Sequence, residues 1–182
     1  MTYRPGSFFL AAAEGWAGYG IALGEALAGS PSRYTHAGII LDADGTVLEA
    51  EPHGARLGNV RAYKHTLISD GPVQSYLAQN GYVDAHPDHG SKIRTAVVAE
   101  ARKLVGVPYS ALDYLALAAL HLHLPSAWIR QRVESSGHLI CSALVDRAYM
   151  NAGIHLFDDG RLPGDVMPSD LAAWAEDWAA RT

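Results

Sequence analysis

The sequence predicts an α+β fold from two observations. Short apolar runs typical of strands lie mainly in the first half of the chain, whereas apolar residues at helical spacing fill most of the second half. The turn signal Asp42-Ala43-Asp44-Gly45 separates two of the strand runs and predicts a β-hairpin.

The first half is predicted to consist of strands interrupted by one helix. The hairpin turn is expected to be formed either by Asp44-Gly45 alone or by all four residues 42–45. Gly29 and Pro31 end the helix, because neither residue continues one well. The predicted elements are a strand at 8–10, a helix at 16–27, the hairpin strands at 34–41 and 46–51, an irregular stretch at 54–70 with one strand candidate, and a strand at 73–77.

The second half reads as helices, and Ser91, Ser110 and Ser169 are the expected N-cap residues of three of them. The predicted elements are a polar loop at 82–90, helices at 91–105, 112–124 and 127–133, a helix beginning near Cys141, a turn at 156–160, an extended segment at 162–166 and a helix at 169–178.

Length and composition describe an ordinary globular chain. Its 182 residues fit one domain spanning 1–182, with 49% hydrophobic and 18% charged residues. A net charge of −5 argues against a nucleic-acid partner, which would need a basic surface. Because Cys141 is the only cysteine, no intramolecular disulfide can form, which fits a reducing compartment.

The apolar stretch at residues 8–28 is interrupted by Glu14, Glu25 and several glycines. It therefore does not predict an integral membrane span. Only Arg4 precedes it and no clean cleavage site follows, so a secretory signal is not predicted either. A cytoplasmic location is expected, with export by another route or delivery by a phage as open alternatives.

Cys141 lies where an amphipathic helix is predicted to begin, after N-cap candidates at residues 135–137. A cysteine in the first turn of a helix faces unpaired backbone N–H groups and the positive end of the helix dipole, and both favour the nucleophilic thiolate. The alternative is a small buried apolar residue with no chemistry.

The hairpin places a histidine and two carboxylates on one face. For the expected turns, the register puts His36 on the same side as Glu49, Glu51 and His53. A carboxylate there could orient the imidazole and stabilise its charged form, and spacing alone does not choose between Glu49 and Glu51. The alternative is a surface strand with an incidental histidine. His86 and His89 have the spacing of metal ligands but lack a third partner, so no metal is expected.

Three motifs follow one another in a fixed order: Tyr-Thr-His-Ala-Gly-Ile at 34–39, Val-Leu-Glu-Ala-Glu-Pro at 47–52 and Ile-Cys-Ser-Ala-Leu-Val at 140–145. Together they resemble the circularly permuted branch of the NlpC/P60 papain-like superfamily, the YiiX-like and lecithin:retinol acyltransferase-like proteins. In that branch the histidine strand precedes the nucleophile helix. The resemblance implies a permuted papain-like fold, in which a small antiparallel sheet packs against helices.

By this resemblance, Cys141 matches the nucleophile, His36 the base and Glu49 the third polar position, with Glu51 in reserve. The Asn-Cys-Glu-His-Phe motif of the acyltransferases is absent around Cys141, and Cys-Ser-Ala-Leu-Val is closer to the YiiX-like group.

The resemblance implies a cysteine hydrolase that needs no cofactor. It would cleave a peptide-type amide, commonly in peptidoglycan, or an ester through a thioester acyl-enzyme. One alternative is a lipid or acyl-chain thiol acyltransferase or esterase, with the helix at 112–124 lining a pocket. Another is a catalytically silent binding or structural module. The expected partner is accordingly a peptide, a peptidoglycan fragment or an acyl lipid.

Overall fold

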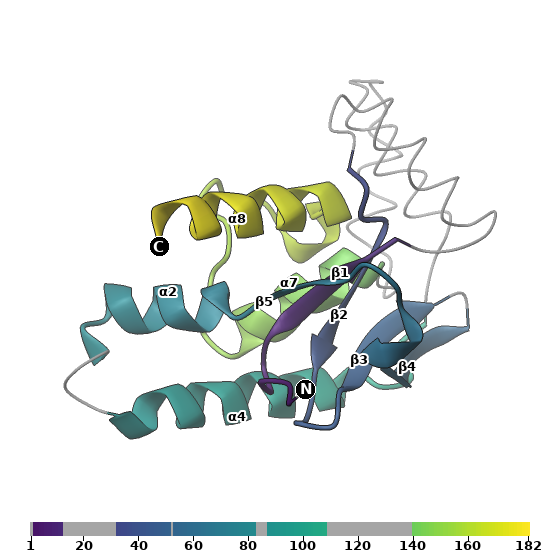
Figure 1. Cartoon of the computed structure of the whole chain (residues 1–182), viewed down its shortest axis with the longest axis horizontal. Helices are drawn as coiled ribbons and strands as arrows, with labels where there is room; N and C mark the ends of the chain where they lie inside the picture. The colour runs from purple at the N-terminus through teal and green to yellow at the C-terminus, as the bar shows by residue number, and fades with distance from the viewer. Residues whose placement is uncertain (1, 13–31, 52, 83–86, 109–139) are drawn as a thin grey trace.

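The computed structural model describes residues 2–12, 32–51, 53–82, 87–108 and 140–182, and these residues form an α+β fold (Figure 1). Their strands make one antiparallel sheet of five strands in the order β4-β3-β2-β1-β5. The strands are β1 Phe8–Ala11, β2 His36–Ile40, β3 Thr46–Glu51, β4 Gly54–Asn59 and β5 Leu67–Ser69.

Four α-helices of the described residues pack beside this sheet, with α7 against β2 and β3, and α4 against α7. Helix α8 contacts β1, and α2 contacts both α4 and α8. The helices are α2 Gly71–Gln79, α4 Pro87–Lys103, α7 Cys141–Asn151 and α8 Pro168–Arg181, and the short 3-10 helices are η1 Val60–Ala62 and η2 Pro163–Asp165.

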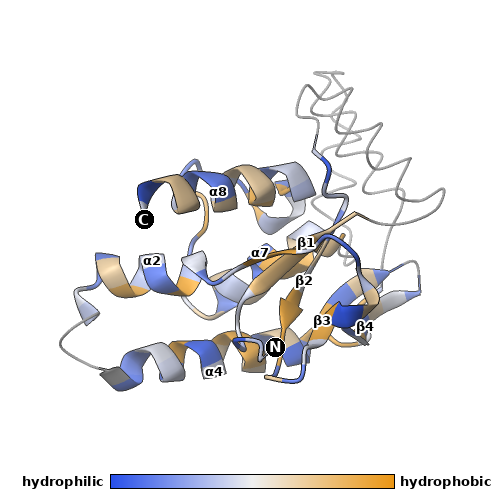
Figure 2. Ribbon diagram, in the orientation of Figure 1, coloured by the Kyte–Doolittle hydropathy of each residue, from blue (hydrophilic) through white to orange (hydrophobic). Residues whose placement is uncertain are grey.

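Both faces of the sheet are buried in its centre, which explains why β1 and β2 are apolar at nearly every position. Figure 2 shows β2 as hydrophobic over most of its length, whereas α4 and α8 carry polar residues as well. The helix-facing side of the sheet contributes Phe8, Leu10, Ala37, Ile39, Leu48 and Ala50 to the main core. The opposite side forms a smaller cluster of Phe9, Ala11, Ile40, Val47 and Val60, against which Tyr3 and Tyr63 pack.

The hairpin turn is the four-residue form, residues 42–45. The Asp42 carboxylate accepts hydrogen bonds from the backbone N–H groups of Asp44 and Thr46, both at 3.0 Å, and Gly45 adopts a φ of +87° that favours glycine. This turn sets Gly38 opposite Glu49 and Ile40 opposite Val47. The register therefore places His36 and Glu49 on the same face, one diagonal step apart.

The structure corrects the sequence prediction at several elements. Residues 73–77 are not a strand but the middle of α2, where Pro72 occupies the first turn and Val73 and Leu77 are buried one helical turn apart. Helix α4 begins at Pro87 rather than at residue 91, with Asp88 in its first turn. The stretch 54–70 holds two strands, β4 and β5, and the predicted extended segment at 162–166 contains η2.

Helix α8 begins at Pro168, one residue earlier than predicted. Its N-cap is Met167, whose backbone N–H donates to the Asp170 carboxylate at 2.8 Å, so Ser169 is not the cap. The helices predicted at 16–27, 112–124 and 127–133 lie outside the described residues.

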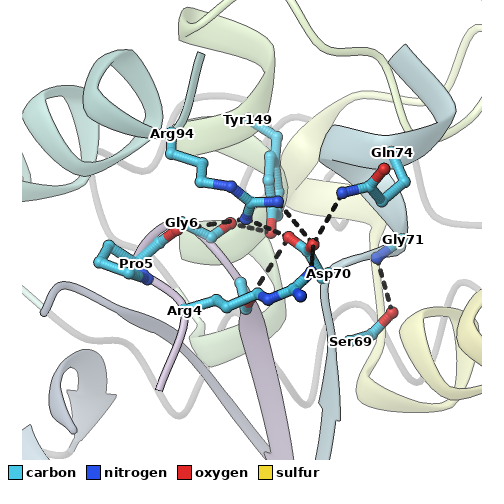
Figure 3. Close-up of polar contacts among 10 residues, drawn as sticks. Arg4, Pro5, Gly6, Ser69, Asp70, Gly71, Gln74, Arg94 and Tyr149 are labelled. Carbon is cyan, nitrogen blue, oxygen red and sulfur yellow. Dashed lines mark hydrogen bonds and ion pairs between the residues drawn. The ribbon is translucent and has the colours of Figure 1, made fainter. Parts of the chain in front are cut away.

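A charged cluster around Asp70 fixes α2, α4 and the N-terminal segment to one another (Figure 3). The Asp70 carboxylate accepts two hydrogen bonds from the Arg94 guanidinium, one from Gln74 at 3.0 Å and one from Arg4 at 3.1 Å. Beside it, the hydroxyl of the fully buried Tyr149 donates to the Gly6 carbonyl at 2.7 Å. The second contact anchors α7 to the segment that leads into β1.

Among the described residues, no helix is long and apolar enough to cross a bilayer.

Candidate active site

His36 is the first residue of β2, and its imidazole packs against aromatic residues of the smaller cluster. The ring packs edge-on against Phe9, with centroids 5.9 Å apart, and tilted against Tyr63 at 5.3 Å. Its side chain is 9% exposed. Packing on two sides leaves the imidazole little freedom to rotate, so its two nitrogens have fixed directions.

Glu49 lies in the centre of β3 and meets His36 across the sheet. Its Oε2 atom is 3.0 Å from His36 Nε2 and accepts a hydrogen bond from the Tyr63 hydroxyl at 2.5 Å. The Arg56 guanidinium lies 3.5 Å from the other oxygen, Oε1. Burial disfavours the charge on Glu49, but the hydrogen bonds from His36 and Tyr63 outweigh it and lower the pKa of the carboxyl.

Two glycines lie beside this buried carboxylate. Gly38 is directly opposite Glu49, and a Cβ there would lie 2.5 Å from the Phe9 ring. A Cβ on Gly58 would come within 2.2 Å of Glu49 Oε1. The absence of a side chain at Gly58 therefore leaves room for the Glu49 carboxylate, and its absence at Gly38 leaves room for the Phe9 ring.

Cys141 is the first residue of α7, directly after the extended N-cap residue Ile140. The backbone N–H groups of the first turn have no partner within the helix. Ser142 fixes the start of the helix, because its buried hydroxyl donates to the Val166 carbonyl at 2.6 Å. Cys141 is only 2% exposed among the described residues. The N-cap candidates predicted at residues 135–137 lie outside the described residues.

The His36 imidazole interacts electrostatically with the Cys141 side chain and is hydrogen-bonded to Glu49. Burial opposes a charge on His36, but the interactions with Cys141 and Glu49 raise the pKa of His36 to about 10. Because Glu49 engages Nε2, we infer that Nδ1 faces the sulfur. A cysteine and a carboxylate on opposite sides of one imidazole is the arrangement that stabilises a thiolate–imidazolium pair.

Of the two carboxylates that the sequence left open, Glu49 contacts His36, whereas Glu51 pairs with Arg56. The Arg56 guanidinium donates to both Glu51 oxygens, at 2.6 and 2.7 Å, near the surface. His53 is exposed just before β4. The structure thus brings Cys141, His36 and Glu49 together. Glu51 is linked to Glu49 through Arg56, which contacts both carboxylates.

The other histidine pattern forms no comparable site in the part of the chain that the structure covers. His86 lies outside the described residues. His89, which is in α4, stacks on Tyr82, and the centroids of the two rings are 4.4 Å apart. Nowhere among the described residues do three or more His, Cys, Asp or Glu side chains gather as metal ligands would.

Sequence reasoning missed Tyr63. It follows η1, which places it beside Glu49, 14 positions away in the chain. No motif surrounds Tyr63, and the stretch at 54–70 looked irregular, so no sequence signal pointed to it.

No protein-family model matches this chain, and no curated protein matches its sequence.

Proposed function

We propose that this chain is a papain-like cysteine hydrolase of the permuted NlpC/P60 type, with Cys141 as nucleophile, His36 as base and Glu49 as the residue that orients His36. The observation that carries the proposal is the buried hydrogen bond between His36 and Glu49, and the electrostatic interaction of the same imidazole with Cys141 at the start of α7 supports it. The antiparallel sheet with α7 packed against the histidine strand is compatible with that fold.

The reaction begins with the pair in its charged form, in which the His36 imidazolium holds the proton and the Cys141 thiolate attacks a carbonyl carbon. A carbon–sulfur bond forms and the carbonyl electrons move to the oxygen. The backbone N–H groups that open α7 are the natural donors to this oxyanion.

Collapse of the tetrahedral intermediate breaks the bond to the leaving group. His36 gives its proton to the departing amine or alcohol, and Cys141 is left as a thioester. His36, now neutral, takes a proton from water, and the resulting hydroxide attacks the thioester. The acid is released, and the proton remaining on His36 restores the imidazolium beside the thiolate.

Glu49 is buried and ionised, and its role is to keep His36 oriented and charged. A carboxylate in this position stabilises the imidazolium without taking its proton. This division of roles follows from the low pKa of Glu49 and the raised pKa of His36.

The substrate class we propose is a peptide-type amide, such as a peptidoglycan stem peptide, with esters as the second class. Acyl transfer can be tested before any natural substrate is known, because an activated ester such as p-nitrophenyl acetate acylates an activated cysteine. The wild-type chain is expected to carry a transient acetyl group on Cys141, detected by mass spectrometry. Cys141→Ala is the control.

A chain that acquires no acyl group on Cys141 would contradict the hydrolase and leave a binding module on the same fold. If acylation occurs, a panel of muropeptides and simple peptide amides is the next step, with the released amine as readout.

A further inference from the structure

We propose that Tyr63 is a positioning residue of this site: its hydroxyl holds the Glu49 carboxylate toward His36, and its ring fixes the plane of the imidazole. The effect of Tyr63 on the reactivity of the Cys141–His36 pair rests on the proposed function. The contacts of Tyr63 with Glu49 and His36 do not.

The Tyr63 hydroxyl and His36 Nε2 share one carboxylate oxygen. The hydroxyl lies 2.5 Å from Glu49 Oε2, and Nε2 lies 3.0 Å from the same atom. Hydrogen bonds from a hydroxyl to an ionised carboxylate are short and strong. The phenol therefore selects the carboxylate rotamer in which Oε2 points at the imidazole.

Arg56 cannot replace this contact. Its guanidinium is 3.5 Å from Glu49 Oε1, its side chain is 54% exposed, and its shorter bonds go to Glu51. An exposed cation shared between two carboxylates holds either of them weakly. The sheltered donor that fixes Glu49 is Tyr63.

The Tyr63 ring acts on His36 directly. The two rings lie 5.3 Å apart at 33°, and on the same sheet face Tyr63 packs against Phe9 at 5.4 Å. The backbone holds Tyr63 in place, because its N–H donates to the Val60 carbonyl at the end of η1. A ring fixed in this way limits rotation of the imidazole between Cys141 and Glu49.

The phenol stays a donor throughout the range in which His36 is charged. Burial and the neighbouring Glu49 carboxylate raise the pKa of Tyr63 above its ordinary value of about 10. The Tyr63–Glu49 bond is therefore independent of pH wherever the Cys141–His36 pair operates.

The test is Tyr63→Phe, which removes the hydroxyl and keeps the ring. Tyr3→Phe is the matched control, because Tyr3 packs on the same apolar cluster and its ring lies under Arg61. Two quantities are measured against pH: the His36 imidazole resonance by NMR, assigned with His36→Gln, and the rate of Cys141 alkylation by iodoacetamide.

In Tyr63→Phe we expect the His36 titration midpoint to fall and alkylation below pH 7 to slow about 3- to 10-fold, the loss expected for one hydrogen bond of ordinary strength because Tyr63 acts on His36 only through Glu49. Tyr3→Phe should match the wild type in both. An unchanged His36 titration and alkylation profile in Tyr63→Phe would overturn the positioning role.

Two further results keep this test separate from that of the proposed function. Wild-type alkylation that does not depend on His36 would count against the hydrolase, whereas the NMR titration reports on Tyr63 in either case. The wild-type chain should also show a slowly exchanging downfield hydroxyl proton from Tyr63. Its absence would contradict the proposal even if Tyr63→Phe fails to fold.

Discussion

His36 Nε2 lies 3.0 Å from Glu49 Oε2, inside the sheet and beside Gly38, which has no side chain. A buried carboxylate and imidazole at this distance stabilise each other's charges, provided that both stay ionised. The raised pKa of His36 favours the protonated imidazole beside Cys141.

Glu49→Gln should slow alkylation of Cys141 by at least about tenfold near pH 6, because it removes a charge-assisted hydrogen bond from His36. Glu51→Gln is the matched control. Glu51 pairs with Arg56 near the surface, so this variant should alkylate like the wild type. Equal slowing by both substitutions would mean that Glu49 has no special role.

Gly58→Ala should impair the site without touching a reactive group. The added Cβ would lie 2.2 Å from Glu49 Oε1, so the carboxylate must move away from His36. We expect alkylation to slow by about tenfold or more, since small misplacements of reacting groups are expensive.

Gly90→Ala is the control for this substitution. It lies in α4, where its Cβ would make an ordinary 3.4 Å contact with Leu77. That variant should alkylate normally and gain up to about 1 kcal/mol of stability from its better helix propensity. Normal alkylation in Gly58→Ala would show that Glu49 tolerates displacement.

Asp70→Asn should lower the free energy of unfolding at pH 7 by about 2 to 4 kcal/mol, because it leaves the Arg94 guanidinium without its charged partner. The measurement is urea unfolding followed by circular dichroism. Asp177→Asn, in an exposed pair with Arg181, is the control and should change stability by less than about 1 kcal/mol. Similar losses in both variants would mean that the Asp70 cluster is no stronger than a surface pair.

The Asp70 cluster also predicts how the free energy of unfolding depends on pH. Burial raises the pKa of Asp70, but the hydrogen bonds from Arg94 and Gln74 outweigh it and lower that pKa below the unfolded value of about 3.9. The stabilisation is therefore present above about pH 4 and is lost as pH falls through the folded pKa. Wild type and Asp70→Asn should converge in stability toward pH 2, and a constant difference between them would contradict this assignment.

Asp146 should show the opposite pH dependence. Burial in α7 raises its pKa to about 6, although His155, Arg161 and Arg147 oppose the shift. The folded chain then disfavours the charged carboxyl, so stability falls as pH rises from about 4 through 6. Asp146→Asn should raise the melting temperature at pH 8 and leave it unchanged at pH 4. A melting temperature that falls at pH 8 would mean that the ionised carboxyl is stabilised in the fold.

The sequence predicted the hairpin well because its turn residues act locally. Asp42 accepts two backbone N–H groups and Gly45 takes a positive φ, so the turn and the register follow from neighbouring residues. The placement of His36 and Glu49 on one face follows from that register. The choice of Glu49 over Glu51 did not, because both share the face and the contacts with His36 and Tyr63 that single out Glu49 form only in the folded chain.

Elements that depend on distant contacts were predicted less well. Residues 73–77 are too short to distinguish a strand from a helix by periodicity, and the packing of α2 against α4 and α8 decides the outcome. Tyr63 was missed for the same reason, since only the folded sheet brings it to Glu49.

The pairing of Cys141 with His36 is tested by the rate of Cys141 alkylation by iodoacetamide against pH, in the wild type and in His36→Ala. We expect a rate that stays high well below pH 8.5, where a free cysteine is half ionised, and that drops when His36 is removed. A thiol that is inert, or that follows the profile of free cysteine with or without His36, would contradict it.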